Sequence, residues 1–247
     1  IARLPLKRGA KIVHGNALAL DWKSMNQNRD IDITANNTTV TVQEPGMEYT
    51  TVNIKTNNLT IIDKRSVGSD NIKVATTFDY ILGNPPFIGS KIMNQTQRNE
   101  VTKEFGNIAG AGVLDYVTAW YVKAARLIQN TRTRCAFVST NSITQGEQVG
   151  ILWNVMMNMF GIKIHFAHRT FKWSNEAKGN AAVYCVIIGF ANYDSNNKRI
   201  FEYEDIKGEA HELKVKNINP YLVDAKDLVI RKESNPICNV PKIKFGN

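Results

Sequence analysis

Residues 78–87, which read FDYILGNPPF, constrain the fold of this chain more than any other stretch. An apolar run reaches Leu82, and Gly83 and two prolines follow, so residues 80–82 are predicted to form a buried strand that ends at Gly83. Each proline fixes its own φ and restricts the preceding residue, which makes the next loop stiff. Because ligands of open α/β sheets bind outside the carboxyl ends of strands, we expect a binding loop here.

The chemistry of this loop is narrow. The Asn84 side-chain oxygen and the Pro85 carbonyl are two acceptors on one rigid turn, with Pro86 stiffening it and Phe87 as an aromatic plate beside them. A planar ring that bears an exocyclic NH2 group fits, since the amine donates two hydrogen bonds while the ring stacks on Phe87. The alternative is an ordinary Pro-rich turn. At roughly 5% usage per residue type, such a string arises by chance on the order of once in several hundred chains of this length, which favours the site.

The motif around Asn84 resembles the catalytic motif of S-adenosylmethionine-dependent amino-methyltransferases, of which the N6-adenine DNA methyltransferases are the largest group. This resemblance implies an α/β fold built on a Rossmann-like class I methyltransferase sheet, with S-adenosylmethionine as cofactor and a flipped adenine in double-stranded DNA as substrate. Asn84, Pro85, Pro86 and Phe87 would then grip and stack the target base. The alternatives are an RNA or protein-glutamine N-methyltransferase that uses the same loop, and a non-catalytic DNA-binding remnant.

Three other segments follow the order of motifs in that family. Asn16, Ala17 and Leu18 come after a short strand signal and match the segment that meets the cofactor, although the family usually has Asp at the position of Asn16. Asp115 matches a later motif that lines the cofactor and base pocket. The alternatives are a turn residue at Asn16 and an ordinary acid at a helix start for Asp115. The polar residues 139–142 after the next strand match the segment that packs behind the Asn-Pro-Pro loop.

The last matching segment is the loop at residues 168–178, which carries aromatic and basic side chains before an apolar strand at 181–190. In the family such a loop supplies a second ring against the flipped base, so Phe171 and Trp173 are the candidates. The alternative is a hydrophobic rim with solvated cations. Lys91, Lys172 and Lys178 are candidate DNA contacts. The resemblance is greatest to single-chain type IIG/IIL restriction–modification proteins, in which nuclease and target-recognition domains share the polypeptide.

Periodicity predicts the remaining organisation. Residues 1–23 and 78–192 form the methyltransferase core, with helices at 113–130 and 145–160 and strands at 134–139 and 162–166. Residues 24–77 alternate β-branched and polar residues between Asn-rich and Pro-Gly breaks, which predicts an inserted β-meander. Residues 193–247 are expected to lead toward a target-recognition region. The family's Gly-rich cofactor loop and first strand are absent from this sequence, so we expect an incomplete sheet, a fragment, and weak cofactor binding by it alone.

Charge and cysteine content agree with this interpretation. The chain has 247 residues and a formal net charge of +9, which favours a polyanionic partner because Lys and Arg displace counterions from phosphates. Its 3 cysteines are widely spaced, so they predict neither a disulfide framework nor a zinc site. No apolar run approaches the ~20 residues of a membrane span, and no signal peptide is visible. We therefore expect a reducing, cytoplasmic location, no membrane contact and no metal.

Overall fold

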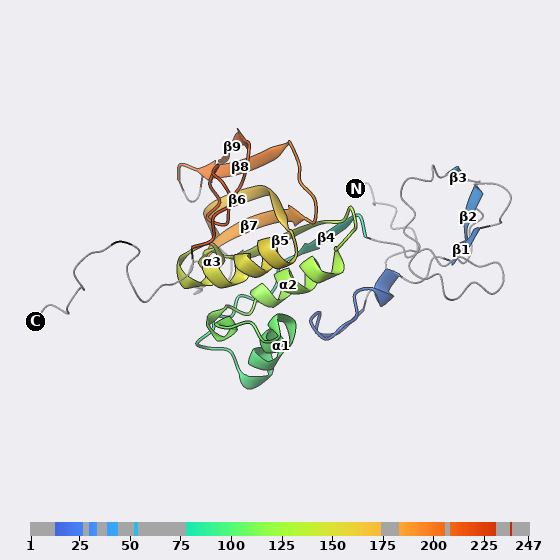
Figure 1. Cartoon of the computed structure of the whole chain (residues 1–247), viewed down its shortest axis with the longest axis horizontal. Coiled ribbons are helices and arrows are strands. Elements are labelled where there is room, and N and C mark those ends of the chain that lie inside the picture. Colours follow the sequence, from blue (N-terminus) through green and yellow to red (C-terminus); the bar gives the residue numbers. More distant parts are fainter. Residues whose placement is uncertain are drawn as a thin grey trace, which may run out of the picture. The chain divides into compact units, whose positions relative to one another are not determined.

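The computed structural model describes residues 13–26, 30–33, 39–43, 52–53, 78–173, 183–205, 208–230 and 238. The chain divides into two compact units, Ile1–Asp79 and Tyr80–Asn247. The first unit contains a short 3-10 helix, Ser24–Asn26, and a three-stranded antiparallel sheet. Its strands β1 (Asp30–Ile33), β2 (Thr39–Gln43) and β3 (Val52–Asn53) pair in chain order, as expected of a meander (Figure 1).

The second unit is built on a six-stranded mixed sheet with the order β4-β5-β7-β6-β8-β9. Strands β4, β5, β6 and β8 run in one direction, whereas β7 and β9 run in the other. This arrangement confirms the expected α/β class. The strands are β4 (Tyr80–Gly83), β5 (Arg134–Thr140), β6 (Lys163–Trp173), β7 (Val183–Ala191), β8 (Lys198–Tyr203) and β9 (Ala210–Val215).

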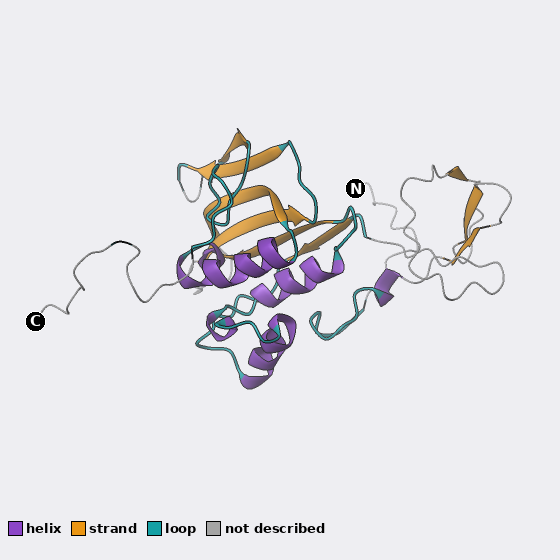
Figure 2. Ribbon diagram, in the orientation of Figure 1, coloured by secondary structure: helices purple, strands orange, loops and turns teal. Residues whose placement is uncertain are grey.

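Helices α2 (Thr118–Leu127) and α3 (Gly146–Trp153) lie against one face of this sheet (Figure 2). The α3 helix continues as a π-helical segment, Asn154–Met159, and the chain turns at Gly161 in the left-handed region, as its glycine predicts. Tyr121 of α2 packs its ring 5.3 Å from Phe137 of β5 and 5.4 Å from Phe190 of β7. These three side chains are buried and form the aromatic centre of the core.

Helix α1 (Gln95–Phe105) forms in a mostly polar segment. Asn94 accepts a hydrogen bond from the backbone N–H of Gln97, while the Gln97 side chain accepts one from the backbone of Asn94. This capping box satisfies two N–H groups that a helix start otherwise leaves unpaired. Arg126 of α2 bonds the Glu104 carboxylate at 2.5 Å, which ties α1 to α2. Local hydrogen bonding therefore overrides the low hydrophobicity of the segment.

Strand β4 exists as predicted, but its burial was predicted wrongly. Tyr80 is 62% exposed and Leu82 is 74% exposed. The reason is topological, because β4 is at the end of the strand order and pairs within the described residues only with β5. An apolar run indicates a strand but does not show how many neighbours it has.

Three further boundaries differ from the sequence expectation. Helix α2 begins at Thr118, after a 3-10 turn at Ala111–Val113, so Asp115 precedes the helix. Strand β6 extends as far as Trp173, so residues 168–173 of the predicted loop belong to a strand. Strands β8 and β9 extend the sheet beyond residue 192, where the core was expected to end. That the rest of the region leads toward a target-recognition domain stays a prediction. Within the described residues, no helix is long and apolar enough to span a membrane.

Gly83 is required by the ring of Phe137. A Cβ atom at Gly83 would lie 3.1 Å from Phe137 Cδ1, and Phe137 is only 1% exposed. The ring cannot move freely, because Tyr121 and Phe190 pack against it. We expect Gly83→Ala to lower the free energy of unfolding by about 1–3 kcal/mol in urea titrations. Gly112→Ala is the control, since its Cβ meets no atom within 4 Å. Equal stability of the two variants would contradict this packing argument.

The thiols offer a second prediction. Burial raises the pKa of Cys135 from 9.0 to about 12 and that of Cys185 to about 11, whereas Cys238 is exposed. The thiolate is the reactive form, so at about pH 8 only Cys238 should react rapidly with a disulfide reagent, and all three should react in denaturant. Unfolded thiols ionise first as the pH rises above about 9, so stability should fall from there toward pH 11. Fast native labelling of Cys135 would contradict the burial.

Candidate functional site

The candidate site lies where the carboxyl ends of strands β4, β5 and β6 meet. Strands β4, β5 and β6 are parallel to one another, so their carboxyl ends meet at the same edge. The register places Gly83 beside Phe137, and three residues later Thr140 is level with Cys185, which in turn pairs with Phe171. The segments that follow these strands include the Asn84 loop and the polar cluster at residues 140–142. This is the edge at which open α/β sheets bind ligands.

The loop after β4 presents the two acceptors that the sequence predicts. Asn84 is exposed, Pro85 is buried and Phe87 is half-buried. Within the described part of the chain, neither the Asn84 side chain nor the Pro85 carbonyl has a hydrogen-bond partner. Polar groups that a stiff loop leaves unsatisfied at a strand end are available to a ligand.

Asp115 connects this loop to the end of β5. Its carboxylate accepts a hydrogen bond from the Ser90 backbone N–H at 3.0 Å and another from the Ser142 hydroxyl at 2.5 Å. The Thr140 hydroxyl lies 3.4 Å from the same oxygen that Ser142 contacts. The side chain of Asp115 is nearly buried, with 8% exposure. One carboxylate therefore holds together segments that follow two different strands.

Backbone and amide bonds reinforce the connection. The Tyr116 N–H donates to the Ile88 carbonyl at 2.9 Å, and the Asp115 N–H donates to the Gln148 side chain at 3.0 Å. Tyr116 also donates its hydroxyl to Glu100 of α1. The sequence indicated the polar cluster after β5, but it carried no signal for Ser90 or Gln148, because their partners are 25 and 33 residues away.

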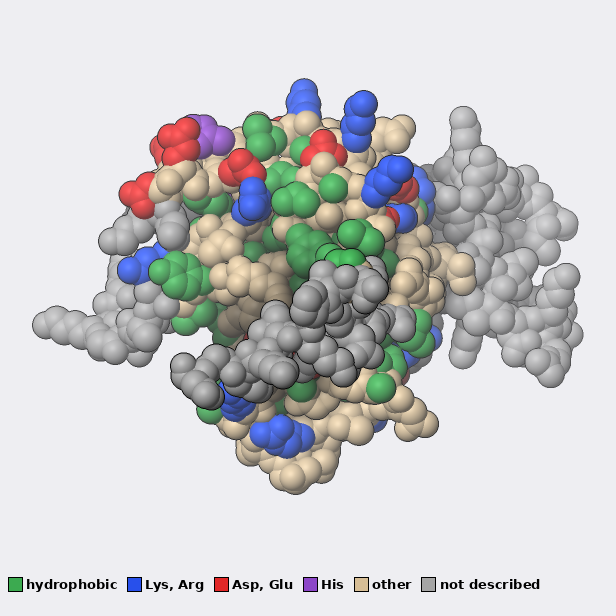
Figure 3. Space-filling model, turned by 60° about the vertical axis from the view of Figure 1, so that its left-hand side comes forward, with side chains coloured by type: hydrophobic (Ala, Val, Ile, Leu, Met, Phe, Trp, Pro, Cys, Tyr) green, Lys and Arg blue, Asp and Glu red, His purple; other side chains and the backbone are tan. Residues whose placement is uncertain are grey.

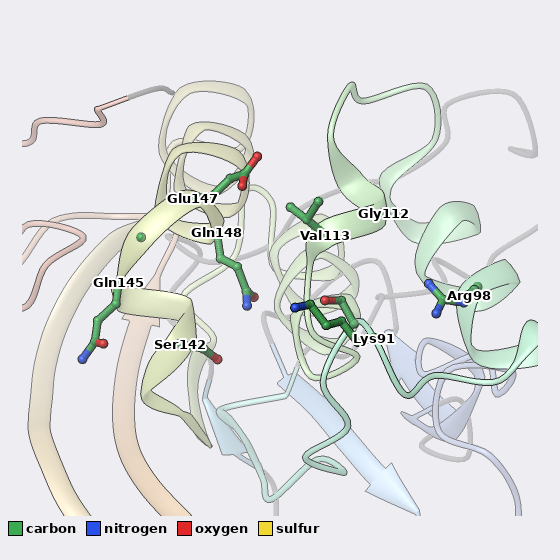
Figure 4. A pocket seen from close by; sticks show the side chains of 10 residues that line it. Lys91, Arg98, Gly112, Val113, Ser142, Gln145, Glu147 and Gln148 are labelled. Atoms are coloured by element: carbon green, nitrogen blue, oxygen red, sulfur yellow. The ribbon is translucent and has the colours of Figure 1, made fainter. Parts of the chain in front are cut away.

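A cavity of about 700 Å³ opens beside this network (Figure 4). Its size is within the range of small-molecule and nucleotide sites. Lys91, one of the predicted DNA contacts, is part of its wall. The cavity is lined by Ser90, Lys91, Arg98, Gly112, Val113, Ser142, Gln145, Gly146, Glu147 and Gln148.

The structure locates Phe171 and Trp173, the candidates for a second aromatic wall, on β6. Phe171 lies on β6 at the correct edge, but its ring lies 5.5 Å from Tyr203 of β8, and it does not line the described cavity. Lys172 is half-buried on the same strand, and Trp173 ends it. Lys178 lies outside the described residues. That Phe171 or Trp173 faces the same base as Phe87 stays a prediction.

Asn16 belongs to the first unit and forms a turn. Its side-chain oxygen accepts from the Leu18 N–H at 2.9 Å, and the Trp22 indole donates to the Ala17 carbonyl at 2.7 Å. The cofactor role of Asn16, Ala17 and Leu18 stays a prediction. Among the described residues, no group of three His, Cys, Asp or Glu side chains could hold a metal ion.

The family model of the MmeI DNA-methyltransferase domain matches residues 1–202. The chain belongs to this family. Its sequence is 44% identical over 169 residues to DNA methyltransferase A of Bacillus subtilis (strain 168). The aligned region covers 68% of this chain and 18% of that protein. These matches confirm the resemblance to the DNA-methyltransferase region of restriction–modification proteins that the sequence predicted.

A solved structure in the same family supports the fold. The type IIL restriction–modification enzyme MmeI, in complex with DNA, is 55% identical to this chain with a TM-score of 0.65. The alignment covers 68% of this chain and 22% of that one. The chain therefore spans about a fifth of the length of these two relatives, and it corresponds to part of their methyltransferase region.

For this MmeI-family domain, the geometry assigns Asp115 a positioning role. Its Oδ1 accepts from the Ser90 N–H and its Oδ2 from the Ser142 hydroxyl, so both oxygens contact donors of the chain itself. The carboxylate thereby sets where residues 88–90 lie, directly after the Asn84 loop. Whether Asp115 also lines the cofactor pocket stays a prediction.

The network around Asp115 can be tested by stability. Asp115→Ala would remove the acceptor of the half-buried Ser90 N–H and one partner of the Ser142 hydroxyl, so we expect a loss of about 1–3 kcal/mol in urea unfolding. Asp115→Asn keeps one acceptor oxygen and should cost less. Glu209→Ala is a control because Glu209 is exposed. A loss at Asp115→Ala no larger than that of the control would show that the network is not structural.

Proposed function

We propose that this chain is the catalytic part of a methyltransferase that transfers a methyl group from S-adenosylmethionine to the N6 amine of adenine in double-stranded DNA. The observation that carries the proposal is a pair of acceptors, Asn84 Oδ1 and the Pro85 carbonyl, that have no partner among the described residues and lie on a Pro-rich loop at the carboxyl end of β4. Membership of the MmeI DNA-methyltransferase domain family supports DNA as the substrate class.

The two acceptors address the difficulty of the reaction. The exocyclic amine of adenine is a poor nucleophile, because its lone pair is delocalised into the ring. Two hydrogen bonds from the amine to Asn84 and Pro85 favour its pyramidal form and stabilise the positive charge that develops on nitrogen. This is electrostatic preorganisation by fixed dipoles. Bound S-adenosylmethionine would supply the electrophilic methyl group on a positively charged sulfur. The loop's task is to hold the amine in line with it.

The substrate base must leave the duplex to reach this loop. Base-modifying enzymes extrude the target nucleotide and stack it between apolar side chains. The half-buried ring of Phe87 is one wall, and Phe171 or Trp173 at the same sheet edge is the proposed second wall. Lys91, Lys172 and Lys178 are the proposed backbone contacts. Asn16, Ala17 and Leu18 are the proposed cofactor contacts, and an amide such as that of Asn16 can both accept a hydrogen bond from an adenine amine and donate one to a ring nitrogen.

The biological setting follows from the relatives. The solved relative is a type IIL restriction–modification enzyme in complex with DNA. We therefore propose that this chain acts within a bacterial restriction–modification protein that also carries nuclease and target-recognition domains, in the cytoplasm.

Asn84→Ala tests the proposal in the full-length protein that carries this chain. Removing one preorganised hydrogen-bonding partner from the reacting group should lower kcat for DNA methylation by about 10²–10³-fold. Affinity for DNA should remain nearly unchanged, since the interaction strengthens in the transition state. Radiolabelled methyl transfer to duplex DNA measures the rate. Asn107→Ala, which changes an exposed asparagine outside the loop, is the matched control.

The same assay separates the competing functions. Transfer to RNA or to a glutamine-containing peptide, with none to DNA, would replace the substrate while keeping the mechanism. Unchanged DNA methylation in Asn84→Ala would show that the loop is not catalytic, as the interpretation as a DNA-binding remnant requires. Digestion of the product to nucleosides and mass analysis should identify N6-methyladenine, and a different methylated base would contradict the assignment to adenine.

A further inference from the structure

The cavity beside the Asn84 loop is positively charged on one wall. Lys91 is exposed in the turn after the loop, and Arg98 lies half-buried in the first turns of α1. Both side chains line the cavity. Within the described residues, neither forms an ion pair or a side-chain hydrogen bond. Two cations that line one hollow without a counter-ion among the described residues make its wall positively charged, so an anion bound in the hollow would be stabilised.

Neutral donors complete the lining. Gln145 and Gln148 approach from the α3 side, and Ser142 lies below them (Figure 4). Gln148 points toward Lys91 in this view, while Arg98 lies on the other side of Lys91. Hydroxyl, amide, ammonium and guanidinium groups are the donors that proteins use for phosphate oxygens.

Two acids are close enough to count against an anion. Glu147 belongs to the cavity wall, but its carboxylate points away from Lys91 (Figure 4). Asp115 lies behind Ser90 and Ser142, and its charge is compensated by the hydrogen bonds that those residues donate. Neither carboxylate pairs with Lys91 or Arg98, so the positive wall remains available.

The position of the cavity indicates which anion it takes. Ser90 lines the cavity, is three residues beyond Phe87, and is held in place by its hydrogen bond to Asp115. The cavity therefore lies close along the chain to the loop that is proposed to hold the base. A nucleotide that rotates out of the duplex turns about its own backbone and leaves its flanking phosphates beside the base pocket. We propose that Lys91 and Arg98 bind a backbone phosphate of the DNA strand that carries the target adenine. This inference rests on the proposed function.

General surface charge does not explain DNA binding as well. The face in Figure 3 shows Lys and Arg mixed with Asp and Glu, with hydrophobic side chains between them, rather than one basic patch. On that face the net charge of +9 does not mark a docking surface. A defined cavity with two uncompensated cations offers a more specific contact, because the phosphate position would be fixed relative to the flipped base.

The experiment uses Lys91→Ala, Arg98→Ala and the double variant in the full-length protein. Alanine is a strong helix former, so the change at Arg98 preserves α1. Lys103→Ala is the matched control, since Lys103 is an exposed cation in the last turn of the same helix and does not line the cavity. Fluorescence anisotropy with duplex DNA that contains the target site measures affinity over a range of salt concentrations, and calorimetry measures S-adenosylmethionine binding.

Each cavity variant should weaken DNA binding about tenfold, as expected for a lost hydrogen bond to a charged group. The slope of log affinity against log salt should fall by about one for each cation removed. Lys103→Ala should change neither quantity by as much, and cofactor affinity should stay the same in all variants. Duplexes in which one phosphate at a time is replaced by a neutral methylphosphonate should reveal one position near the target adenine. Removing the charge there should weaken DNA binding by the unmodified protein but should not weaken binding by the double variant any further.

Two results would overturn the inference. A double variant that matches Lys103→Ala in affinity and salt slope would show that the cavity takes no phosphate. A double variant that loses S-adenosylmethionine binding with DNA affinity unchanged would assign the cavity to the carboxylate of the cofactor. Failure of the proposed function is a separate result, because it would appear as absent DNA methylation by the unmodified protein.

Discussion

The carboxylate of Asp115 is the constraint on which the candidate site depends. It accepts hydrogen bonds from Ser90, three residues after the Asn84 loop, and from Ser142, two residues after β5, and it lies just before α2. The backbone bond from the Tyr116 N–H to the Ile88 carbonyl joins the same segments, so the carboxylate and this bond together set their spacing. A polar network of this kind is rigid when all its members are paired. The loop is thereby held from its far end.

The near end of the loop is held by packing instead. Gly83 brings the end of β4 against the ring of Phe137, and that ring belongs to the aromatic core formed with Tyr121 and Phe190. The two prolines stiffen what lies between. The loop is therefore fixed by van der Waals contact on one side and by hydrogen bonds on the other, while its own acceptors stay unsatisfied. Such preorganisation is the property that a site for a weak nucleophile requires.

The sequence was most informative where chemistry is local. Asn-Pro-Pro-Phe predicted a loop after a strand, and the helix predicted at 145–160 is followed by a turn at Gly161; both depend on backbone properties of single residues. The sequence was less informative where neighbouring strands decide the outcome. Among the described residues β4 pairs only with β5, which explains the exposure of Leu82, and pairing with β7 explains why β6 extends to Trp173. The partners of Asp115 lie too far along the chain for any pattern to show them.

The edge position of β4 has a consequence for local opening. Within the described residues this strand is paired on one side only, and it is four residues long, whereas β5 is paired on both sides. The amide hydrogens of β4 should therefore exchange with solvent faster than those of β5, since fewer contacts must break to release them. The acceptors of the candidate site thus follow a short outer strand of the sheet. Binding of a base and a cofactor should therefore slow amide hydrogen exchange at residues 80–83 before it changes exchange in the core.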